Sequence, residues 1–269
     1  MESSPLMRPA LAARPVAPYV GGKRNLAGRL ARLIETTPHE VYAEVFVGMG
    51  GVFLRRRTRP GGEVINDGSR DVANLFRILQ RHYVAFVELL RFQLTTRAEF
   101  DRLSAENPDT LTDLERAARF LYLQRNGFGG RVEKRSFAMG IGGGRHARFD
   151  VTRLTPMLED LHARLAGVLI EQLPFAEFIR RYDGAGVLFY LDPPYWGSED
   201  YYGAAMFDRA DFARLRDALA AIKGRFILSI NDVPQIREIF AGFDMVGAET
   251  SYGLSSTGST KAHELIIRN

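Results

Sequence analysis

The stretch that decides the fold is Val-Leu-Phe-Tyr-Leu-Asp-Pro-Pro-Tyr, residues 187–195. Its first five residues are aliphatic or aromatic without polar alternation, which predicts a strand covered on both faces, as in the middle of a parallel sheet. Pro193 and Pro194 then end the strand, because proline fixes φ and lacks the backbone N–H that a neighbouring strand needs. The stiff loop that follows lies at the carboxyl edge of the predicted sheet, where open α/β sheets bind ligands.

This loop carries two adjacent acceptors and one flat ring. The carboxylate of Asp192 and the carbonyl of Pro193 can accept both hydrogens of an exocyclic amino group, while Tyr195 can stack on a planar base. Such stacking contributes roughly 1–3 kcal/mol per base. The alternative is a plain strand-end turn, because Asp-Pro is a common turn former. The tetrapeptide after an apolar strand resembles the catalytic motif of amino-group methyltransferases that use S-adenosylmethionine.

Composition limits the classes of protein that remain. The chain has 269 residues, 46% of them hydrophobic, which is enough for one substantial core and a smaller appended domain. It has no cysteine, so disulfides, thiolate zinc sites and cysteine nucleophiles are excluded. Neither a membrane-crossing apolar run nor a signal peptide is visible, and we expect a soluble cytoplasmic protein.

Positive charge is concentrated in one segment. The net charge is +4, yet residues 116–148 hold eight Lys or Arg residues and a single acidic one. A basic segment in an otherwise slightly acidic chain is typical of a surface that binds a phosphate backbone. A solvated basic face explains the same charge count.

A second ligand-binding pattern stands near the N-terminus. A strand is predicted at 41–46, a glycine-rich turn at 47–51 and a helix at 52–57, which together open a nucleotide-binding βαβ unit. The next strand, 63–65, ends at Asp67, 19 residues beyond Gly48, close to the spacing at which an acid meets ribose hydroxyls. The third glycine of the dinucleotide pattern is absent, which favours an adenosyl ligand over NAD.

Another glycine pair, residues 21–22, precedes a predicted helix at 25–36 and directs the ammonium of Lys23 toward the same space. Residues 1–17 show no periodicity and are expected to form a mobile leader. A long helix is predicted at 71–91. Helices within 96–125 interrupt the alternation of strands and helices, which indicates a separate small helical domain, followed by a glycine-rich basic hairpin or loop from residue 124.

Alternation resumes after this insertion. The predicted elements are helices at 151–165, 175–181 and 209–222, a helix that begins at Pro234, and strands at 167–171, 187–191, 226–228, 244–248 and 263–267, with a loop at 251–260 before the last strand. The fold class is therefore α/β, with a Rossmann-like, mostly parallel sheet and an antiparallel C-terminal hairpin. The predicted divisions are a leader at 1–17, a cofactor-binding catalytic domain at 18–92 and 149–269, and an inserted helical target-recognition domain at 93–148.

Taken together, the motifs from Tyr19 to the C-terminus resemble those of the Dam-type (D12 class) DNA adenine-N6 methyltransferases. The resemblance implies S-adenosylmethionine as cofactor, held by Tyr19, Lys23, Glu44, Phe46, Gly48, Gly50, Asp67 and Asp192. It implies catalysis by Asp192, Pro193 and Tyr195. Ser229-x-Asn231-Asp232 and Lys261-x-x-Glu264-Leu265 match the closing motifs of the family.

The element at 125–130 resembles a family motif beside the DNA, although Gln124 and Gly129 stand where the family commonly has asparagine, and Val45 replaces its usual proline. With the basic loop, this element supplies the candidate DNA contacts: Arg125, Asn126, Arg131, Lys134, Arg135 and Arg145.

The function that follows is transfer of a methyl group to N6 of a flipped-out adenine in double-stranded DNA, with no metal and no membrane involved. Two alternatives stay open. The chain could act on adenine in RNA, or it could be an inactive homologue that only binds nucleic acid. A cognate restriction endonuclease is one expected partner, alongside phage self-protection or an orphan regulatory role, and the sequence does not reveal which DNA sequence is recognised.

Overall fold

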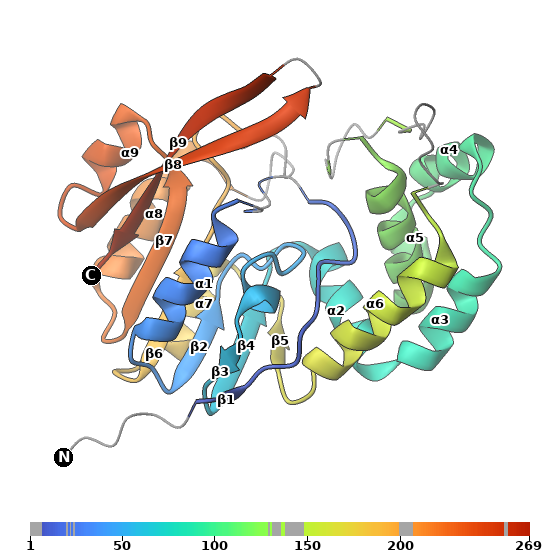
Figure 1. Cartoon of the computed structure of the whole chain (residues 1–269), viewed down its shortest axis with the longest axis horizontal. Helices are drawn as coiled ribbons and strands as arrows, with labels where there is room; N and C mark the ends of the chain where they lie inside the picture. The colour runs from blue at the N-terminus through green and yellow to red at the C-terminus, as the bar shows by residue number, and fades with distance from the viewer. Residues whose placement is uncertain are drawn as a thin grey trace.

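The centre of the molecule is a seven-stranded sheet in the order β5-β4-β2-β6-β7-β9-β8 (Figure 1). The computed structural model describes residues 7–19, 21, 23, 25–128, 130, 136–137, 148–198, 207–255 and 258–269, without the side chains of 250–255 and 258–262. The strands are β2 (Val41–Glu44), β4 (Gly62–Asn66), β5 (Leu169–Glu171), β6 (Val187–Leu191), β7 (Arg225–Asn231), β8 (Asp244–Ser255) and β9 (Gly258–Arg268). The first five pair in parallel, and β9 pairs antiparallel with both β7 and β8. The predicted fold class is confirmed.

Strand β6 is buried along its whole length, as its sequence predicts. Leu188 and Tyr190 pack into the core cluster on the face covered by α1 (Ala27–Thr36) and α2 (Arg70–Arg81). Phe189 and Leu191 pack into the cluster on the opposite face. That face is covered by α7 (Phe175–Tyr182), α8 (Arg209–Ala220) and α9 (Pro234–Ile239). Each of these buried side chains contributes about 1.5–3 kcal/mol.

The strand order creates a switch point beside β6. From β2 the chain passes to β4 on one side, whereas β6 lies on the other side of β2. The connections therefore diverge at the carboxyl ends of β2 and β6, which leaves a crevice between them. This is the edge at which Glu44 and Asp192 end their strands.

Four helices gather beside the β5 side of the sheet: α3 (Tyr83–Arg91), α4 (Arg97–Ala105), α5 (Asp113–Asn126) and α6 (Val151–Arg164) (Figure 1). We call them the helical unit. Their buried residues Phe86, Phe100, Phe120 and Leu154 join the same core cluster as the α1 face of the sheet. Since α3 and α6 lie outside residues 93–148, the packed unit is larger than the predicted insertion. A separate target-recognition domain stays a prediction. No helix in the described part of the chain is long and apolar enough to cross a membrane.

A buried ion cluster joins the helical unit to the sheet. Glu63 of β4 accepts two hydrogen bonds from Arg164 of α6, each 2.7 Å long, and it also pairs with Arg56. All three side chains are fully buried. Removing one partner of a buried, hydrogen-bonded pair costs about 3–5 kcal/mol. The guanidinium of Arg164 also stacks 3.9 Å from the ring centre of Phe53, so this end of α6 is firmly held.

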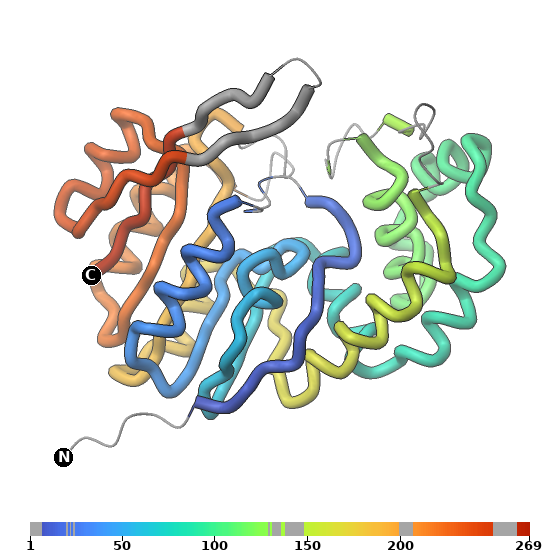
Figure 2. The backbone as a smooth tube through the Cα atoms, in the orientation of Figure 1, coloured from blue at the N-terminus to red at the C-terminus, as the bar shows by residue number. Residues whose placement is uncertain are grey.

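The predicted mobile leader is wrong for residues 7–17. Strand β1 (Arg8–Pro9) pairs antiparallel with β3 (Thr58–Arg59), and Val16 and Ala17 are buried. Figure 2 shows this segment in dark blue, running from β1 across the molecule toward the carboxyl edge of the sheet. We call residues 10–19 the strap. Apolar burial and pairing to a strand fix it, although its sequence has no periodicity.

Three other predicted boundaries are wrong. The expected helix at 52–57 is a single 3-10 turn, η1 (Phe53–Arg55), because Arg56 is extended and turns toward Glu63. The helix at 71–91 breaks at His82 (φ −125°, ψ 31°) into α2 and α3, both of which pack against α5 and α6. Helix α5 continues to Asn126, so the glycine-rich segment begins later than expected. A further 3-10 turn, η2 (Pro108–Thr110), precedes α5.

The loop predicted at 251–260 is instead part of a long hairpin. Ser251 pairs with Lys261, and Tyr252 with Thr260, so β8 and β9 continue well beyond the sheet (Figure 1). Part of the predicted basic hairpin is also present. Phe128 N–H donates to the carbonyl of Ser136 over 2.9 Å, and Gly127 bridges to Phe137.

Candidate active site

A cavity of about 270 Å³ opens at the carboxyl edge of the sheet. Its wall includes the residues that end three neighbouring strands: Glu44 of β2, Asp67 after β4 and Asp192 after β6. Of the predicted cofactor-binding residues, the cavity wall also contains Tyr19, Lys23, Phe46 and Gly48. The strap contributes Pro15 and Ala17. Gly50, also predicted to bind the cofactor, is not among the residues that line the cavity. A Cβ atom added at Gly50 would lie 3.1 Å from the side chain of Leu54.

The glycine turn is shaped by its surroundings. Gly48 has φ 50°, and a Cβ atom there would lie 2.9 Å from the ring of Tyr19. Both the backbone conformation and the close approach of the ring therefore require glycine. The Gly48 N–H donates to Asp67 Oδ2 over 2.9 Å, and the Ser69 N–H donates to Asp67 Oδ1. Burial raises the pKa of Asp67 to about 6, against the lowering effect of these two bonds.

Glu44 is a buried acid with a partner inside the core. The hydroxyl of Tyr42 donates to Glu44 Oε2 over 2.5 Å. Burial raises the pKa of Glu44 to about 8, although the Tyr42 bond and Arg56 both lower it. Arg56 lies 3.6 Å from the ring centre of Tyr42, so the ion cluster of Glu63 continues through Tyr42 to the cavity wall.

Asp192 shares a cation with another acid. Lys23 Nζ lies 2.9 Å from Asp192 Oδ1 and 3.0 Å from Glu264 Oε2, and it also donates to the hydroxyl of Tyr195. Burial raises the pKa of Asp192 to about 7. Lys23 opposes this rise, and Glu264 adds to it. The first acceptor predicted for an amino group is thus ion-paired in the free protein.

The loop that carries Asp192 is fixed to the next strand. Asn231, at the end of β7, accepts from the Trp196 N–H over 3.0 Å and donates to the Trp196 carbonyl over 3.1 Å. Below the loop, the hydroxyls of Tyr190 and Ser229 bond to each other over 2.8 Å. Two of the residues in the predicted closing motif Ser229-x-Asn231 therefore hold the loop in place.

This constellation agrees with the match to known families. The model of the D12 class N6 adenine-specific DNA methyltransferases matches residues 19–254, which include the strands that lead to Glu44, Asp67 and Asp192. The chain belongs to this family.

Three similar proteins are also named as methyltransferases. The type II methyltransferase M1.LlaDCHI of Lactococcus lactis subsp. cremoris is 26% identical, and the match covers 95% of each chain. The type II methyltransferase M.CviBI of Paramecium bursaria Chlorella virus NC1A is 21% identical over 89% of this chain and 91% of its own. The DNA N-6-adenine-methyltransferase of Escherichia phage P1 is 26% identical, over 94% of this chain but 35% of its own.

The sequence predicted Phe46 in this wall of the cavity, but Phe175 and Phe207 beside it were not predicted. Phe46, Phe175 and Phe207 form an aromatic group in which the ring centres lie 5.7–6.0 Å apart, and all three line the cavity. Phe175 follows Pro174, just beyond β5, at the same carboxyl edge. That position after a predicted strand is the signal that could have identified it.

Arg125 and Asn126, predicted to contact DNA, make internal contacts in this structure, and their contact with DNA stays a prediction. Arg125 donates from Nη1 to the Val16 carbonyl over 2.5 Å and from Nε to the Arg148 carbonyl over 3.0 Å. Asn126 is buried and donates to the Tyr122 carbonyl. The neighbouring Gln124 donates to the carbonyls of Pro18 and Gly130. The end of α5 thus holds the strap that closes one side of the cavity. The other predicted DNA contacts lie outside the described residues: Arg131, Lys134, Arg135 and Arg145.

Proposed function

We propose that this carboxyl edge is the active site, and that it transfers a methyl group from S-adenosylmethionine to N6 of an adenine in double-stranded DNA. The observation that carries the proposal is a partly buried carboxylate, Asp192, that follows the strand at the switch point and lines the same cavity as the glycine turn. Methyl donor and target nitrogen are thereby brought to one place, which is how positioning accelerates such a reaction.

The residues present fit the cofactor. Glu44 and Asp67 are buried acceptors suited to its amino and hydroxyl groups, and the turn at Gly48 lets the ligand approach the backbone closely. The rings of Phe46, Phe175 and Phe207 offer an apolar surface for its adenine. S-adenosylmethionine supplies an electrophilic methyl group on a sulfonium centre.

The chain itself prepares the nucleophile. The N6 lone pair of adenine is delocalised into the ring and is weakly nucleophilic. Asp192 and the carbonyl of Pro193, by accepting both amino hydrogens, favour a pyramidal nitrogen whose lone pair is free to form the new N–C bond. The positive charge that develops on this nitrogen is stabilised by the carboxylate. Asp192 is then placed to take the proton that N6 loses, and Tyr195 to stack on the base.

The substrate surface follows from the arrangement of the fold. The β8–β9 hairpin and the helical unit stand on either side of the carboxyl edge (Figure 1). We propose that duplex DNA lies across this edge between them. An adenine inside a duplex cannot reach Asp192, so it must be flipped out of the stack.

The direct test uses labelled S-adenosylmethionine, unmethylated duplex DNA and purified protein, with nucleoside analysis for N6-methyladenine. We expect methylation of duplex DNA, and a rate at least about 100-fold lower for Asp192→Ala with cofactor binding retained, as expected for loss of a group that stabilises the transition state. Structured RNA is assayed in parallel. Methylated adenine in RNA but not in DNA would indicate that the protein is an RNA adenine methyltransferase. Binding of S-adenosylmethionine without methyl transfer to either substrate would indicate an inactive homologue.

A further inference from the structure

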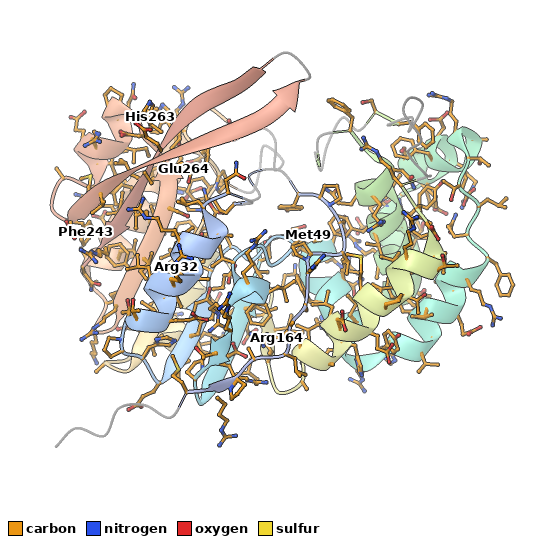
Figure 3. The ribbon with its side chains drawn as sticks, viewed as in Figure 1. Arg32, Met49, Arg164, Phe243, His263 and Glu264 are labelled. Atoms are coloured by element: carbon orange, nitrogen blue, oxygen red, sulfur yellow. The ribbon has the colours of Figure 1, made fainter. Side chains whose placement is uncertain are left out.

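Glu264 is a buried acid for which the reaction proposed above has no role. It lies on β9 (Figure 3) and is 1% exposed. Its partner in the register of β7 and β9 is Asn231, the residue that holds the loop carrying Asp192, which we call the catalytic loop. Its carboxylate approaches Lys23 Nζ to 3.0 Å. Burying a carboxylate at this position costs free energy of desolvation unless a partner offsets that cost, so its presence calls for a structural or functional explanation.

Lys23 is shared between two anions. Asp192 and Glu264 both contact one ammonium group, so their nearest oxygens lie within about 6 Å of each other. With all three groups ionised the cluster carries one excess negative charge. The remaining titratable groups around Asp192 are Glu44 of β2, Tyr190 of β6 and Tyr195, which lies on the same loop as Asp192.

This sharing poses a problem for catalysis. Lys23 Nζ lies 2.9 Å from Asp192 Oδ1. In the proposed reaction, a carboxylate oxygen of Asp192 must accept a hydrogen from the target amino group. The ammonium must loosen its contact with Asp192 when the adenine arrives. It is 1% exposed, so solvent cannot receive it, whereas Glu264 already contacts it.

We propose that Glu264 is a positioning residue for methyl transfer: it retains the Lys23 ammonium while Asp192 turns to the target amino group. This inference rests on the proposed function. Glu264 is not among the residues that line the cavity, and it acts through Lys23. Without the Glu264 charge, Lys23 has Asp192 as its remaining carboxylate partner among the described contacts, and it competes with the adenine for that oxygen.

The test compares Glu264→Gln with a matched control, Glu249→Gln, which makes the same change at an exposed position of the paired strand β8. Single-turnover methyl transfer, cofactor affinity and the pH dependence of the rate are measured for each. We expect Glu264→Gln to slow transfer by about tenfold or more while cofactor affinity changes less than about threefold. Its acid limb should move to lower pH, because the Glu264 charge raises the pKa of Asp192. Glu249→Gln should match the wild-type protein.

A double-mutant cycle separates positioning from simple support of the fold. If Glu264 acts through Lys23, Lys23→Met with Glu264→Gln should be no slower than Lys23→Met alone, because the lost interaction is the same. Strictly additive losses, or a wild-type rate and acid limb in Glu264→Gln, would overturn the proposal.

Should Gln at position 264 prevent folding, Glu264→Asp carries the test. It retains the charge on a shorter side chain, so a slower rate is expected, and a rate and pH profile equal to wild type would again overturn the role. Absence of N6-methyladenine with the wild-type protein would instead contradict the proposed function itself. The two failures are therefore distinguishable.

Discussion

The backbone N–H of Gly48 donates to the carboxylate of Asp67 over 2.9 Å, so the turn after β2 is fixed by the end of β4. Asp67, which the spacing of 19 residues from Gly48 predicts as a ribose contact, therefore also stabilises the glycine turn through this hydrogen bond. Because Asp67 accepts from Gly48 and Ser69 and still lines the cavity, one side chain supports both the protein and the ligand.

Asp67→Asn should weaken cofactor binding by about tenfold or more. The substitution removes a charge and one of two acceptor oxygens, and a hydrogen bond to a charged group contributes about 1.5–3 kcal/mol. Calorimetric titration with S-adenosylmethionine measures the change. An affinity equal to wild type would remove Asp67 from the cofactor site.

Gly48→Ala should destabilise the protein by more than the backbone conformation alone explains, because its Cβ atom meets the Tyr19 ring at 2.9 Å. Gly197→Ala is the matched control. Gly197 also has a positive φ, of 86°, but open space around it, so its cost is strain without a clash. Thermal unfolding of both variants measures the difference, and equal losses would argue that Tyr19 moves aside freely.

The rate of methyl transfer should rise with pH through about 7. Burial raises the pKa of Asp192 to about 7 in the free protein, and its ionised form is the acceptor for the amino group. The pH dependence of kcat/KM reports the free enzyme and is the measurement to make. An acid limb near pH 4 would show that Asp192 is solvated as an ordinary aspartate.

The stability of the free protein should fall as pH rises from 5 to 8. The pKa of Glu44 is raised to about 8 in the folded state, so its neutral form favours folding, and this contribution is lost as the group ionises. Glu44→Gln keeps the shape and an acceptor for Tyr42 but cannot ionise. Its melting temperature should therefore fall less over this range, while its cofactor affinity is reduced. Parallel melting curves for the two proteins would contradict the assignment.

Arg125→Ala should weaken cofactor binding, because the strap loses its bond at the Val16 carbonyl. Arg153→Ala, an exposed arginine of α6, is the control. The salt dependence of DNA binding tests the competing prediction from sequence. A phosphate contact at Arg125 would lower the slope of log K against log salt by about 1, whereas a strap clamp leaves it unchanged.

Sequence reasoning succeeded where the determinants are local. The run at 187–191 has no polar residue, so a strand buried on both faces was predictable, and the glycines and Asp67 follow a known spacing. It failed where distant segments decide. The strap is held by α5 and is preceded by β1, which pairs with β3, and nothing in residues 8–19 indicates those partners.

Glu264 shows the same limit. Its place beside Lys23 depends on β9 returning antiparallel next to β7, a long-range pairing that cannot be read from residues 261–265. The end of α5 was misplaced for a local reason. The glycines that suggest a loop begin at Gly127, whereas Arg125 and Asn126 still belong to the helix.

The two bonds from Arg164 to Glu63 decide which partner must change shape when DNA binds. These bonds join α6 to β4 in the protein interior. The helical unit therefore cannot move away from the sheet without leaving a buried charge unpaired. The helical unit is therefore held at a constant position relative to β4. If duplex DNA lies across this edge as proposed, a rigid unit of this kind favours duplexes that kink and unstack easily, and part of the sequence preference then arises from the mechanics of DNA rather than from contacts to base edges.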